Sequence, residues 1–293
     1  MKIINKIVSS YLEKRRQAKP PVLRIETTNA CNASCITCPR PKMTRKIGTM
    51  DMSLFGSLIE QAGLLGIKKV HLHNYGEPLL DKELKEKIAC AKSKGMHVKI
   101  FTNASLLSDE KAKEVVSAGI DEIKISMDGV TKETFERIRK NLKFDDVTQG
   151  IENIIKARKR AKKPGLHLVL VAFDENREEI SLLKKRWKGR VDSVIVTRYH
   201  NWAEENEDKL TLLQKLQRKI PCARLWKTVT VLWDGRVALC CLDFDGHMIL
   251  GDLSRHSLKE IWEGEGYQRV RSLHIRGEQD NIPLCRSCTI GRL

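Results

Sequence analysis

The sequence has 293 residues, of which 41% are hydrophobic, so the chain can bury one large core and a small appendage. It has neither a run of about 18 apolar residues nor a signal peptide, which predicts a cytoplasmic protein and excludes a membrane-spanning one. The net charge of +17 suggests an anionic partner, but the 5% of aromatic residues do not alternate with basic ones as in a nucleic-acid binder.

Residues 1–20 are predicted to contain an N-terminal amphipathic helix. Its apolar residues recur on one side, namely Ile3, Ile4, Ile7, Val8, Tyr11 and Leu12. A basic run over 14–16 follows, and Pro20 ends the helix. We expect this helix to dock against the body of the protein. Contact with a membrane surface or a partner is the alternative for such a basic amphipathic segment.

Strand-like and helix-like patterns alternate between residues 21 and 203. The strand-like runs are Val22–Thr28, Lys68–Asn74, His97–Thr102, Glu122–Met127, Leu166–Phe173 and Asp192–Arg198. The helical patterns are Met52–Leu65, Asp81–Ser93, Ser108–Ala118, Lys132–Arg139, Asp145–Arg160 and Arg177–Lys188. Six such units predict an α/β domain with a parallel sheet, either an incomplete barrel or an open doubly wound sheet.

Polar residues gather where these strands end. A cysteine loop follows the first strand, and the turn 75–78 follows the second. Later strand ends carry Asn103, Ser126, Asp128, Arg198, Tyr199 and His200. The carboxyl ends of barrel strands are where enzymes of this architecture place their sites. The sequence therefore predicts a functional site at this edge.

Three cysteines in the first loop, Cys31, Cys35 and Cys38, have the spacing C-x3-C-x2-C. Three thiolates can hold three irons of a 4Fe–4S cubane and leave the fourth iron open for chemistry. A structural zinc site is the alternative, but zinc sites of that kind use four protein ligands, usually in two short pairs. The ligand number and spacing favour a catalytic cluster.

This motif resembles the signature of the radical S-adenosylmethionine (SAM) superfamily, and the resemblance extends over most of the chain. It implies a partial (β/α)6 barrel, which decides between the two sheet architectures. It also implies an enzyme in which SAM binds the open iron and is reductively cleaved to a 5'-deoxyadenosyl radical, which abstracts a hydrogen atom from the substrate. A reductant such as flavodoxin or ferredoxin is then needed.

The turn Tyr75-Gly76-Glu77-Pro78 resembles the superfamily's Gly-Gly-Glu-Pro motif, which holds the SAM amino group. Gly76, Glu77 and Pro78 are in register, whereas Tyr75 replaces a glycine. A glycine lets the main chain approach a ligand, and a carboxylate suits an ammonium group. As an isolated pattern, Gly-Glu-Pro also fits an ordinary turn after a strand.

Further SAM contacts are implied by the same resemblance. Ser126 and Asp128 match the position of the ribose contacts, although a turn or a helix cap also explains Asp128. Arg139 resembles an arginine that meets the SAM carboxylate, and Asn103 joins these expected cofactor-binding residues. Thr37 stands where many relatives carry an aromatic residue, so packing against adenine is expected from elsewhere.

A polar stretch over 204–220 is predicted to link the barrel to a module over 221–293. Asp234-Gly235 lies between alternating apolar runs and predicts a hairpin that brings Cys222 near Cys240. A terminal C-x2-C pair can close a four-cysteine site. A zinc ribbon would explain this pattern too.

The module resembles the shortened SPASM domain called Twitch, which holds one auxiliary 4Fe–4S cluster. The resemblance assigns the ligands Cys222, Cys240, Cys285 and Cys288, and the choice of Cys240 over Cys241 depends on spacing alone. Four cysteine ligands leave no iron vacant, so this cluster is expected to carry electrons rather than bind substrate.

The candidate acid/base and substrate-contacting residues are His71, His73, Arg198, Tyr199 and His200. His71 and His73 share one strand face, so they point together into the barrel or out of it. A histidine on a strand is more often structural.

The expected substrate is a carbohydrate-like or nucleotide-linked small molecule, oxidised or otherwise modified, and the basic charge favours a phosphorylated one. A peptide is the alternative substrate. A non-enzymatic iron-sulfur or zinc protein that binds nucleic acid is a different class of function. It leaves the Gly76-Glu77 turn and the six-unit alternation without a purpose, so nucleic acid is not the expected partner.

Overall fold

One twisted sheet runs through the molecule. The computed structural model describes residues 7–8, 10–13, 19–158, 163–199, 220–286 and 288. Within them the strand order is β6-β5-β4-β3-β2-β1-β7-β8-β9. The strands are β1 (Val22–Ile25), β2 (Lys69–His71), β3 (His97–Thr102), β4 (Glu122–Ser126), β5 (Gly165–Ala172), β6 (Ser193–Arg198), β7 (Thr228–Val231), β8 (Arg236–Ala238) and β9 (Ile249–Asp252). Neighbouring strands from β6 to β7 are parallel, whereas β8 and β9 pair antiparallel.

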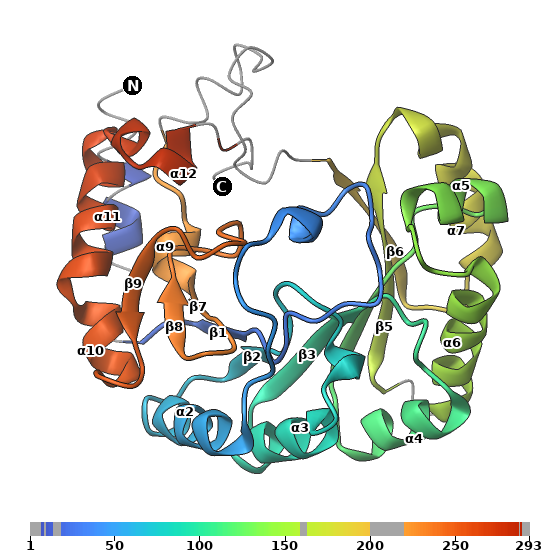
Figure 1. Ribbon diagram of the computed structural model, residues 1–293, viewed down its shortest axis with the longest axis horizontal. Helices are drawn as coiled ribbons and strands as arrows, with labels where there is room; N and C mark the ends of the chain where they lie inside the picture. The colour runs from blue at the N-terminus through green and yellow to red at the C-terminus, as the bar shows by residue number, and fades with distance from the viewer. Residues whose placement is uncertain are drawn as a thin grey trace.

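Helices line the outer, convex side of the parallel strands (Figure 1). They are α2 (Met52–Leu64), α3 (Leu84–Ser93), α4 (Asp109–Ser117), α5 (Lys132–Ile138), α6 (Phe144–Ala157) and α7 (Ile180–Trp187). Alternate strand residues, such as Leu23, Val70 and Val98, are fully buried in the core that these helices cover. A doubly wound sheet would carry helices on both faces. The predicted partial (β/α)6 barrel is therefore confirmed.

Two helices begin later than expected from the sequence. Helix α3 begins at Leu84 rather than Asp81, because residues Pro78–Leu80 form a separate 3-10 turn, η2. Before α7, the 3-10 segment η3 (Asp174–Glu179) replaces the first turn. The Asn176 amide donates hydrogen bonds of 2.9 Å to the carbonyls of Asp128 and Val171, which holds this tight turn against the strand ends.

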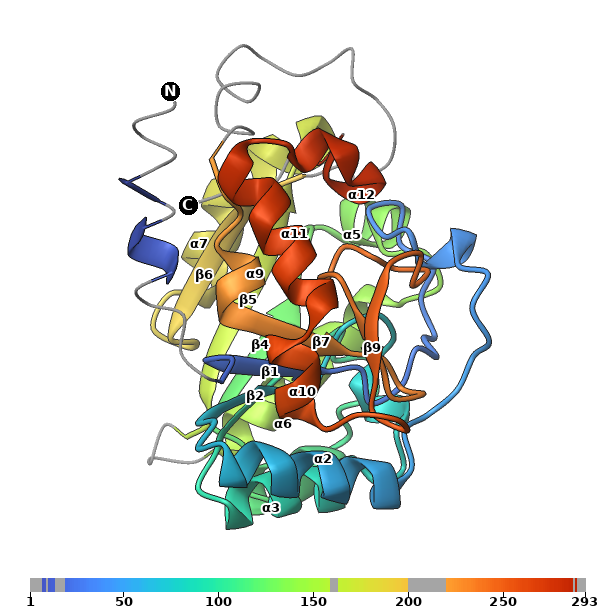
Figure 2. The same ribbon diagram turned by 90° about the vertical axis from the view of Figure 1, so that its left-hand side faces the viewer.

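The carboxyl-terminal part extends the barrel sheet, because β7 pairs with β1 in parallel. Helix α9 (Arg224–Lys227) leads into β7, and the predicted hairpin joins β7 to β8 through Gly235, whose φ is 87°. The remaining elements are α10 (Leu258–Glu263), α11 (Glu265–Arg276), η5 (Gln279–Asn281) and α12 (Pro283–Arg286). Figure 2 shows α10 and α11 packed over this end of the sheet. Most of the predicted linker, 204–219, lies outside the described residues.

The described residues of the N-terminal segment, 7–8 and 10–13, are helical. Leu12 is buried in an apolar cluster with Leu225 and Trp226, and Glu13 accepts a hydrogen bond of 2.9 Å from the Trp226 indole. The helix thus docks on the carboxyl-terminal module. None of the helices in the described ranges is long and apolar enough to cross a bilayer.

Candidate active site

The cysteine loop after β1 is held in place by backbone hydrogen bonds. The Ser34 amide donates to the Lys140 carbonyl at 2.9 Å, and the Ile36 amide donates to the Ile138 carbonyl at 3.0 Å. The loop is thereby fixed to the end of α5. Cys35 is buried, and Cys31 and Cys38 are half-buried against the barrel core. The three thiols lie at the predicted edge of the barrel.

The electrostatics of this loop fit an iron cluster. Burial raises the pKa of the Cys31 thiol to about 11 and also raises the pKa of Cys38. Buried thiolates need a cation beside them, which the irons of a cluster supply. Within the described residues, no three His, Cys, Asp or Glu side chains converge on a single metal-ion position. In a cubane each cysteine binds a different iron, so cysteines that do not converge on one point are compatible with a cluster.

The turn after β2 packs directly against the start of the cysteine loop. Gly76 has a φ of 95°, and a Cβ atom there would lie 2.3 Å from the Thr28 carbonyl oxygen. The Glu77 amide donates to the Ala30 carbonyl at 2.8 Å. Only glycine tolerates both this dihedral angle and this close approach. Gly76 thus brings the predicted SAM-binding turn beside Cys31.

The Glu77 carboxylate is largely occupied by the protein. It accepts hydrogen bonds from the Leu79 amide at 3.1 Å, the Thr102 hydroxyl at 2.6 Å and the Asn103 amide at 2.7 Å. Burial raises its pKa to about 7. A carboxylate has about four acceptor positions, so about one is left for a ligand. Glu77 therefore shapes the ends of β2 and β3.

Asn103 links the third strand end to the cysteine loop. The side-chain amide of Asn103 donates from its nitrogen to the Asn32 side chain at 2.9 Å. Its side-chain oxygen accepts from the Ser105 hydroxyl at 2.7 Å. Asn32 in turn donates to Ser105 at 2.9 Å. The loops after β1, β2 and β3 thus form one hydrogen-bonded unit, as expected for side chains at the carboxyl ends of neighbouring strands.

Arg139 and Asp128 form an ion pair of 2.6 Å beside the cysteines. Arg139 also donates to the Cys35 sulfur at 3.5 Å, and the Asp128 and Cys35 charges raise its pKa although burial opposes this. Asp128 is fully buried and accepts from the Val171 amide at 2.7 Å. Asp128 therefore holds Arg139 and β5, and its contact with a ribose stays a prediction. Ser126 is 8% exposed and lies on the inner strand face with Lys124.

His71 and His73 lie together on the inner barrel face. Their rings stack with centroids 5.5 Å apart, and His73 meets the edge of Phe101 at 5.8 Å. Burial, with Lys99 and Arg24 nearby, lowers the pKa of His71 to about 3. In the described part of the chain, neither Nδ1 atom has a hydrogen-bond partner. Both imidazoles are thus neutral at physiological pH and can accept a hydrogen bond.

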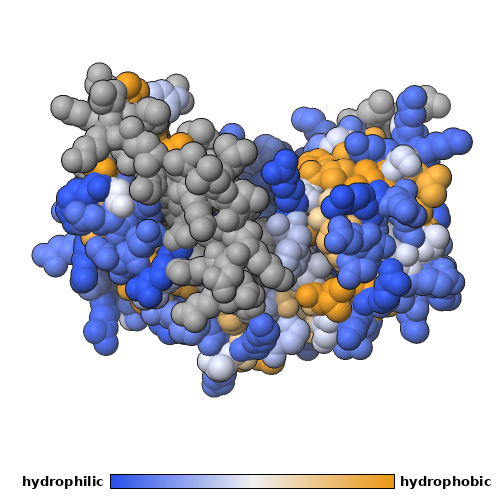
Figure 3. Space-filling view, turned by 90° about the horizontal axis from the view of Figure 1, so that it is seen from above, coloured by the Kyte–Doolittle hydropathy of each residue, from blue (hydrophilic) through white to orange (hydrophobic). Residues whose placement is uncertain are grey.

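Arg198 and Tyr199, two other acid/base candidates, lie at the end of β6. Arg198 ends β6, the strand at the opposite edge of the sheet from the module, and Tyr199 is 52% exposed beside it. Figure 3 shows an apolar surface on the side of the molecule that carries β6, where Val196 and Leu182 are also exposed. His200 lies outside the described residues. The structure therefore joins His71 to His73, and the roles of Arg198 and Tyr199 stay a prediction.

The auxiliary cysteines come together from separate segments. Cys222, Cys240 and Cys285 pack against one apolar cluster that contains Leu225. Burial, with Cys241, Cys285 and Cys222, raises the pKa of Cys240. Although burial opposes it, the charges of Cys222, Cys240 and Cys288 raise the pKa of Arg224. Cys288 therefore lies near the other auxiliary cysteines.

Cys241 has different surroundings. Although burial opposes it, Arg24 and Arg224 lower the pKa of Cys241, and Arg224 donates to its sulfur at 3.2 Å. Its neighbour Cys240 is buried beside Cys241, Cys285 and Cys222. The choice of Cys240 as the fourth member of the auxiliary set stays a prediction.

The two cysteine regions are joined by contacts that sequence reasoning missed. The Tyr75 hydroxyl donates to the Cys241 carbonyl at 2.9 Å. Asp245 accepts from the Thr44 amide at 2.7 Å and from the Arg45 amide at 3.0 Å. Arg45 also forms a buried ion pair of 2.8 Å with Glu26. In the sequence, Tyr75 stood out only as a departure from a motif. Its size and its place beside the turn were the signal that it could contact another part of the chain.

Comparison with known families matches both parts of the chain. The sequence model described as "Radical SAM superfamily" matches residues 25–185. The model described as "Iron-sulfur cluster-binding domain", SPASM, matches residues 222–289. The first match contains the barrel cysteines and the turn at Gly76, and the second contains the auxiliary cysteines.

Individual relatives are similar over different lengths. A PqqA peptide cyclase from Gluconobacter oxydans is 29% identical over 199 residues, covering 65% of this chain and 53% of the relative. The chain thus spans about half the length of the peptide cyclases that it matches. The SAM-dependent 2-deoxy-scyllo-inosamine dehydrogenase of Niallia circulans is 22% identical over 91% of this chain and 92% of that protein.

A solved structure shows the same fold over nearly the whole chain. The crystal structure of BtrN in complex with AdoMet and 2-DOIA has a TM-score of 0.65 and 19% sequence identity. The alignment covers 92% of this chain and 93% of that one. The barrel and the carboxyl-terminal module therefore recur together in that structure.

Proposed function

The chain belongs to the radical SAM superfamily, and we propose that it is an enzyme that cleaves SAM reductively and removes a hydrogen atom from a small molecule in its barrel. The observation that carries this proposal is the hydrogen-bonded unit of three strand ends around Cys31, Cys35 and Cys38, with Arg139 beside Cys35. Domains of these two families bind SAM and iron-sulfur clusters, respectively.

When bound, SAM and the two 4Fe–4S clusters supply a 5'-deoxyadenosyl radical and an electron acceptor. The chain's own residues then hold and orient these groups. Cys31, Cys35 and Cys38 supply the thiolates of the barrel site, and the Gly76 turn supplies main-chain groups for the SAM amino end. Arg139, oriented by Asp128, supplies the positive charge for the SAM carboxylate.

The reaction that fits best is oxidation of a carbohydrate-like molecule. Oxidation of a secondary alcohol to a ketone removes a hydrogen atom from carbon, a proton from oxygen and one electron. The bound cofactors would take up the hydrogen atom and the electron. The neutral imidazoles of His71 and His73 would accept the hydrogen bond of the hydroxyl group and pass its proton on to solvent. One electron from flavodoxin or ferredoxin starts each turnover, and the clusters favour the reducing cytoplasm.

Similarity to a small-molecule dehydrogenase over nearly the whole chain supports a small substrate. The SAM-dependent 2-deoxy-scyllo-inosamine dehydrogenase from Niallia circulans aligns with 91% of this chain. The inner barrel face also carries Arg24, Lys99 and Lys124, which favours an anionic small molecule. A peptide substrate remains the second candidate because of the peptide cyclase similarity.

The first test quantifies 5'-deoxyadenosine after anaerobic reconstitution with iron and sulfide and addition of SAM and dithionite. We expect production by the intact protein and none by a variant with alanine at Cys31, Cys35 and Cys38. Cys90→Ala is the matched control, because Cys90 is half-buried in α3, away from both cysteine sets. If the intact protein carries its full iron complement but forms no 5'-deoxyadenosine, the proposed function is wrong.

A further inference from the structure

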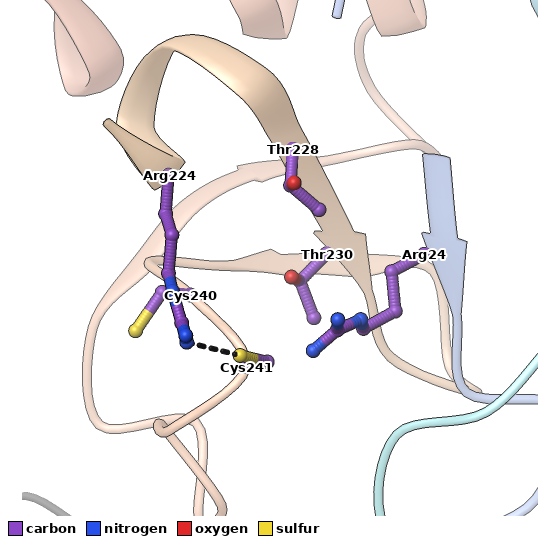
Figure 4. Close-up of a pocket in the computed structure, with 6 residues that line it drawn as sticks. All are labelled: Arg24, Arg224, Thr228, Thr230, Cys240 and Cys241. Carbon is purple, nitrogen blue, oxygen red and sulfur yellow. Dashed lines mark hydrogen bonds between the residues drawn. The ribbon is translucent and has the colours of Figure 1, made fainter. Parts of the chain in front are cut away.

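A pocket of about 140 Å³ lies at the seam between the barrel and the auxiliary module (Figure 4). Its lining residues are Arg24, Arg224, Thr228, Thr230, Cys240 and Cys241. Arg24 of β1 lies opposite Thr230 of β7, and Arg224 comes from α9. Thr228 and Thr230 alternate along β7 and so share one face of the sheet with Arg24. Figure 4 shows the two arginines approaching Cys241 from different sides.

The ionisable groups that line this pocket are two arginines and two cysteines. Two guanidinium groups line it, and none of the six lining residues is an aspartate or a glutamate. The positive charge continues into the barrel, where Lys99 lies close enough to lower the pKa of His71. Of the nearby carboxylates among the described residues, Glu26 pairs with Arg45 at 2.8 Å and Glu122 with Lys124 at 3.6 Å. Low-dielectric walls around like charges attract an anion strongly.

Hydrogen-bond donors in the pocket also lack acceptors. Among the described residues, the Arg24 Nε atom and the Thr230 hydroxyl are buried and have no hydrogen-bond partner. Thr230 is only 1% exposed. The Cys241 sulfur, a weak acceptor, is shared between both guanidinium groups, each of which has five N–H donors. Buried polar groups without partners are costly, so a ligand that accepts these hydrogen bonds stabilises the site.

The size and direction of the donors define the ligand. Ligand pockets for whole small molecules usually exceed about 300 Å³, so this space holds one group of a larger molecule. The donors approach from β1, β7 and α9, not from one plane. A carboxylate offers two coplanar oxygens, whereas a phosphate offers three terminal oxygens in a tetrahedral arrangement, which suits donors from several sides.

We propose that this pocket is a phosphate subsite in which Arg24, Arg224 and Thr230 bind the phosphate group of the substrate. This inference rests on the proposed function, which it deepens by naming a substrate class, the phosphorylated small molecules. Tyr75 holds the Cys241 carbonyl next to the Gly76 turn, so the subsite adjoins the SAM-binding end of the barrel. The phosphate then anchors one end of the substrate beside the auxiliary module.

The test measures binding of inorganic phosphate by calorimetry to the full-length reconstituted protein, without SAM or reductant. We expect Arg24→Gln and Arg224→Gln to weaken the affinity by roughly tenfold or more, as for lost hydrogen bonds to a charged group. Arg177→Gln is the matched control, because Arg177 is exposed and pairs with Asp174 at 3.0 Å. Arg24→Lys keeps the charge and should retain part of the affinity. Iron content is measured for every variant, so loss of the auxiliary cluster is recognised.

The outcomes separate this inference from the proposed function. Phosphate binding that the pocket variants weaken and the control leaves unchanged supports the subsite, even if the protein forms no 5'-deoxyadenosine. Undetectable phosphate binding, or equal affinity in all variants with intact iron content, overturns it and leaves an adventitious ion only. Acetate that binds as tightly as phosphate overturns the phosphate assignment in favour of a carboxylate ligand.

Discussion

The two cysteine sites are built in opposite ways. Cys31, Cys35 and Cys38 lie within eight consecutive residues, and one loop fixed by backbone hydrogen bonds holds them. The auxiliary cysteines extend from Cys222 to Cys288 and meet only because an apolar cluster packs their segments together. The first site is therefore encoded locally, whereas the second depends on tertiary packing.

This difference determines which substitutions would disrupt each site. The barrel site fails when its loop cannot approach the neighbouring strand ends, because its partners are main-chain groups and the side chains of Asn103 and Glu77. The auxiliary site fails when one distant ligand is lost, because each segment contributes only one or two cysteines. Changes at each site should therefore have separable effects on iron content and on SAM binding.

The largest effect is expected from cysteine substitutions in the auxiliary module. Cys240→Ala should lower the iron content by about four atoms per chain, the number in one cubane, and abolish product formation. Cys241→Ala should keep that iron, because the Cys241 sulfur accepts a hydrogen bond of 3.2 Å from Arg224. Iron analysis and electron paramagnetic resonance of the reduced proteins distinguish the two variants. Loss of that iron in Cys241→Ala but not in Cys240→Ala would make Cys241 the ligand.

The sequence was sufficient for features that depend on neighbouring residues. Strand and helix patterns gave the barrel, and the cysteine spacing and the turn at Gly76 placed the barrel site at the correct strand ends. The partners of buried side chains could not be predicted in this way. Asp128, expected to contact the ribose, also binds Arg139 and β5, and only the folded chain brings those groups together.

The pocket at the seam is a further example of long-range information. Arg24 and Arg224 are 200 positions apart in sequence, and neither belongs to a recognisable motif. They meet because β7 adds to the barrel sheet beside β1 and carries α9 with it.

An intermediate effect is expected at the turn of the barrel site. Gly76→Ala places a Cβ atom 2.3 Å from the Thr28 carbonyl at a φ of 95°, so the turn must move. We expect a destabilisation on the order of 2 to 4 kcal/mol and a large loss of SAM affinity, with auxiliary iron retained. Equilibrium dialysis with SAM and thermal unfolding of the reconstituted protein measure both.

Gly56→Ala is the matched control for that experiment. Gly56 lies inside α2, and a Cβ atom there meets no other atom within 4 Å. Alanine in a helix interior should therefore stabilise the protein by about 0.5 to 1 kcal/mol. Unchanged SAM affinity in Gly76→Ala would show that the turn does not form part of the SAM site.

The smallest effect is expected where the two sites touch. Tyr75→Phe removes the hydrogen bond of 2.9 Å to the Cys241 carbonyl and keeps the ring, which meets Phe244 edge-on at 6.1 Å. Because one hydrogen bond contributes about 1 kcal/mol, both clusters and SAM cleavage should persist with only a small loss of thermal stability. If the two sites are independent and this contact is minor, the electron paramagnetic resonance spectrum of the auxiliary cluster should be unchanged. A clear spectral change in Tyr75→Phe would instead mean that the barrel site fixes the geometry of the auxiliary one, so that the two are built as a single unit.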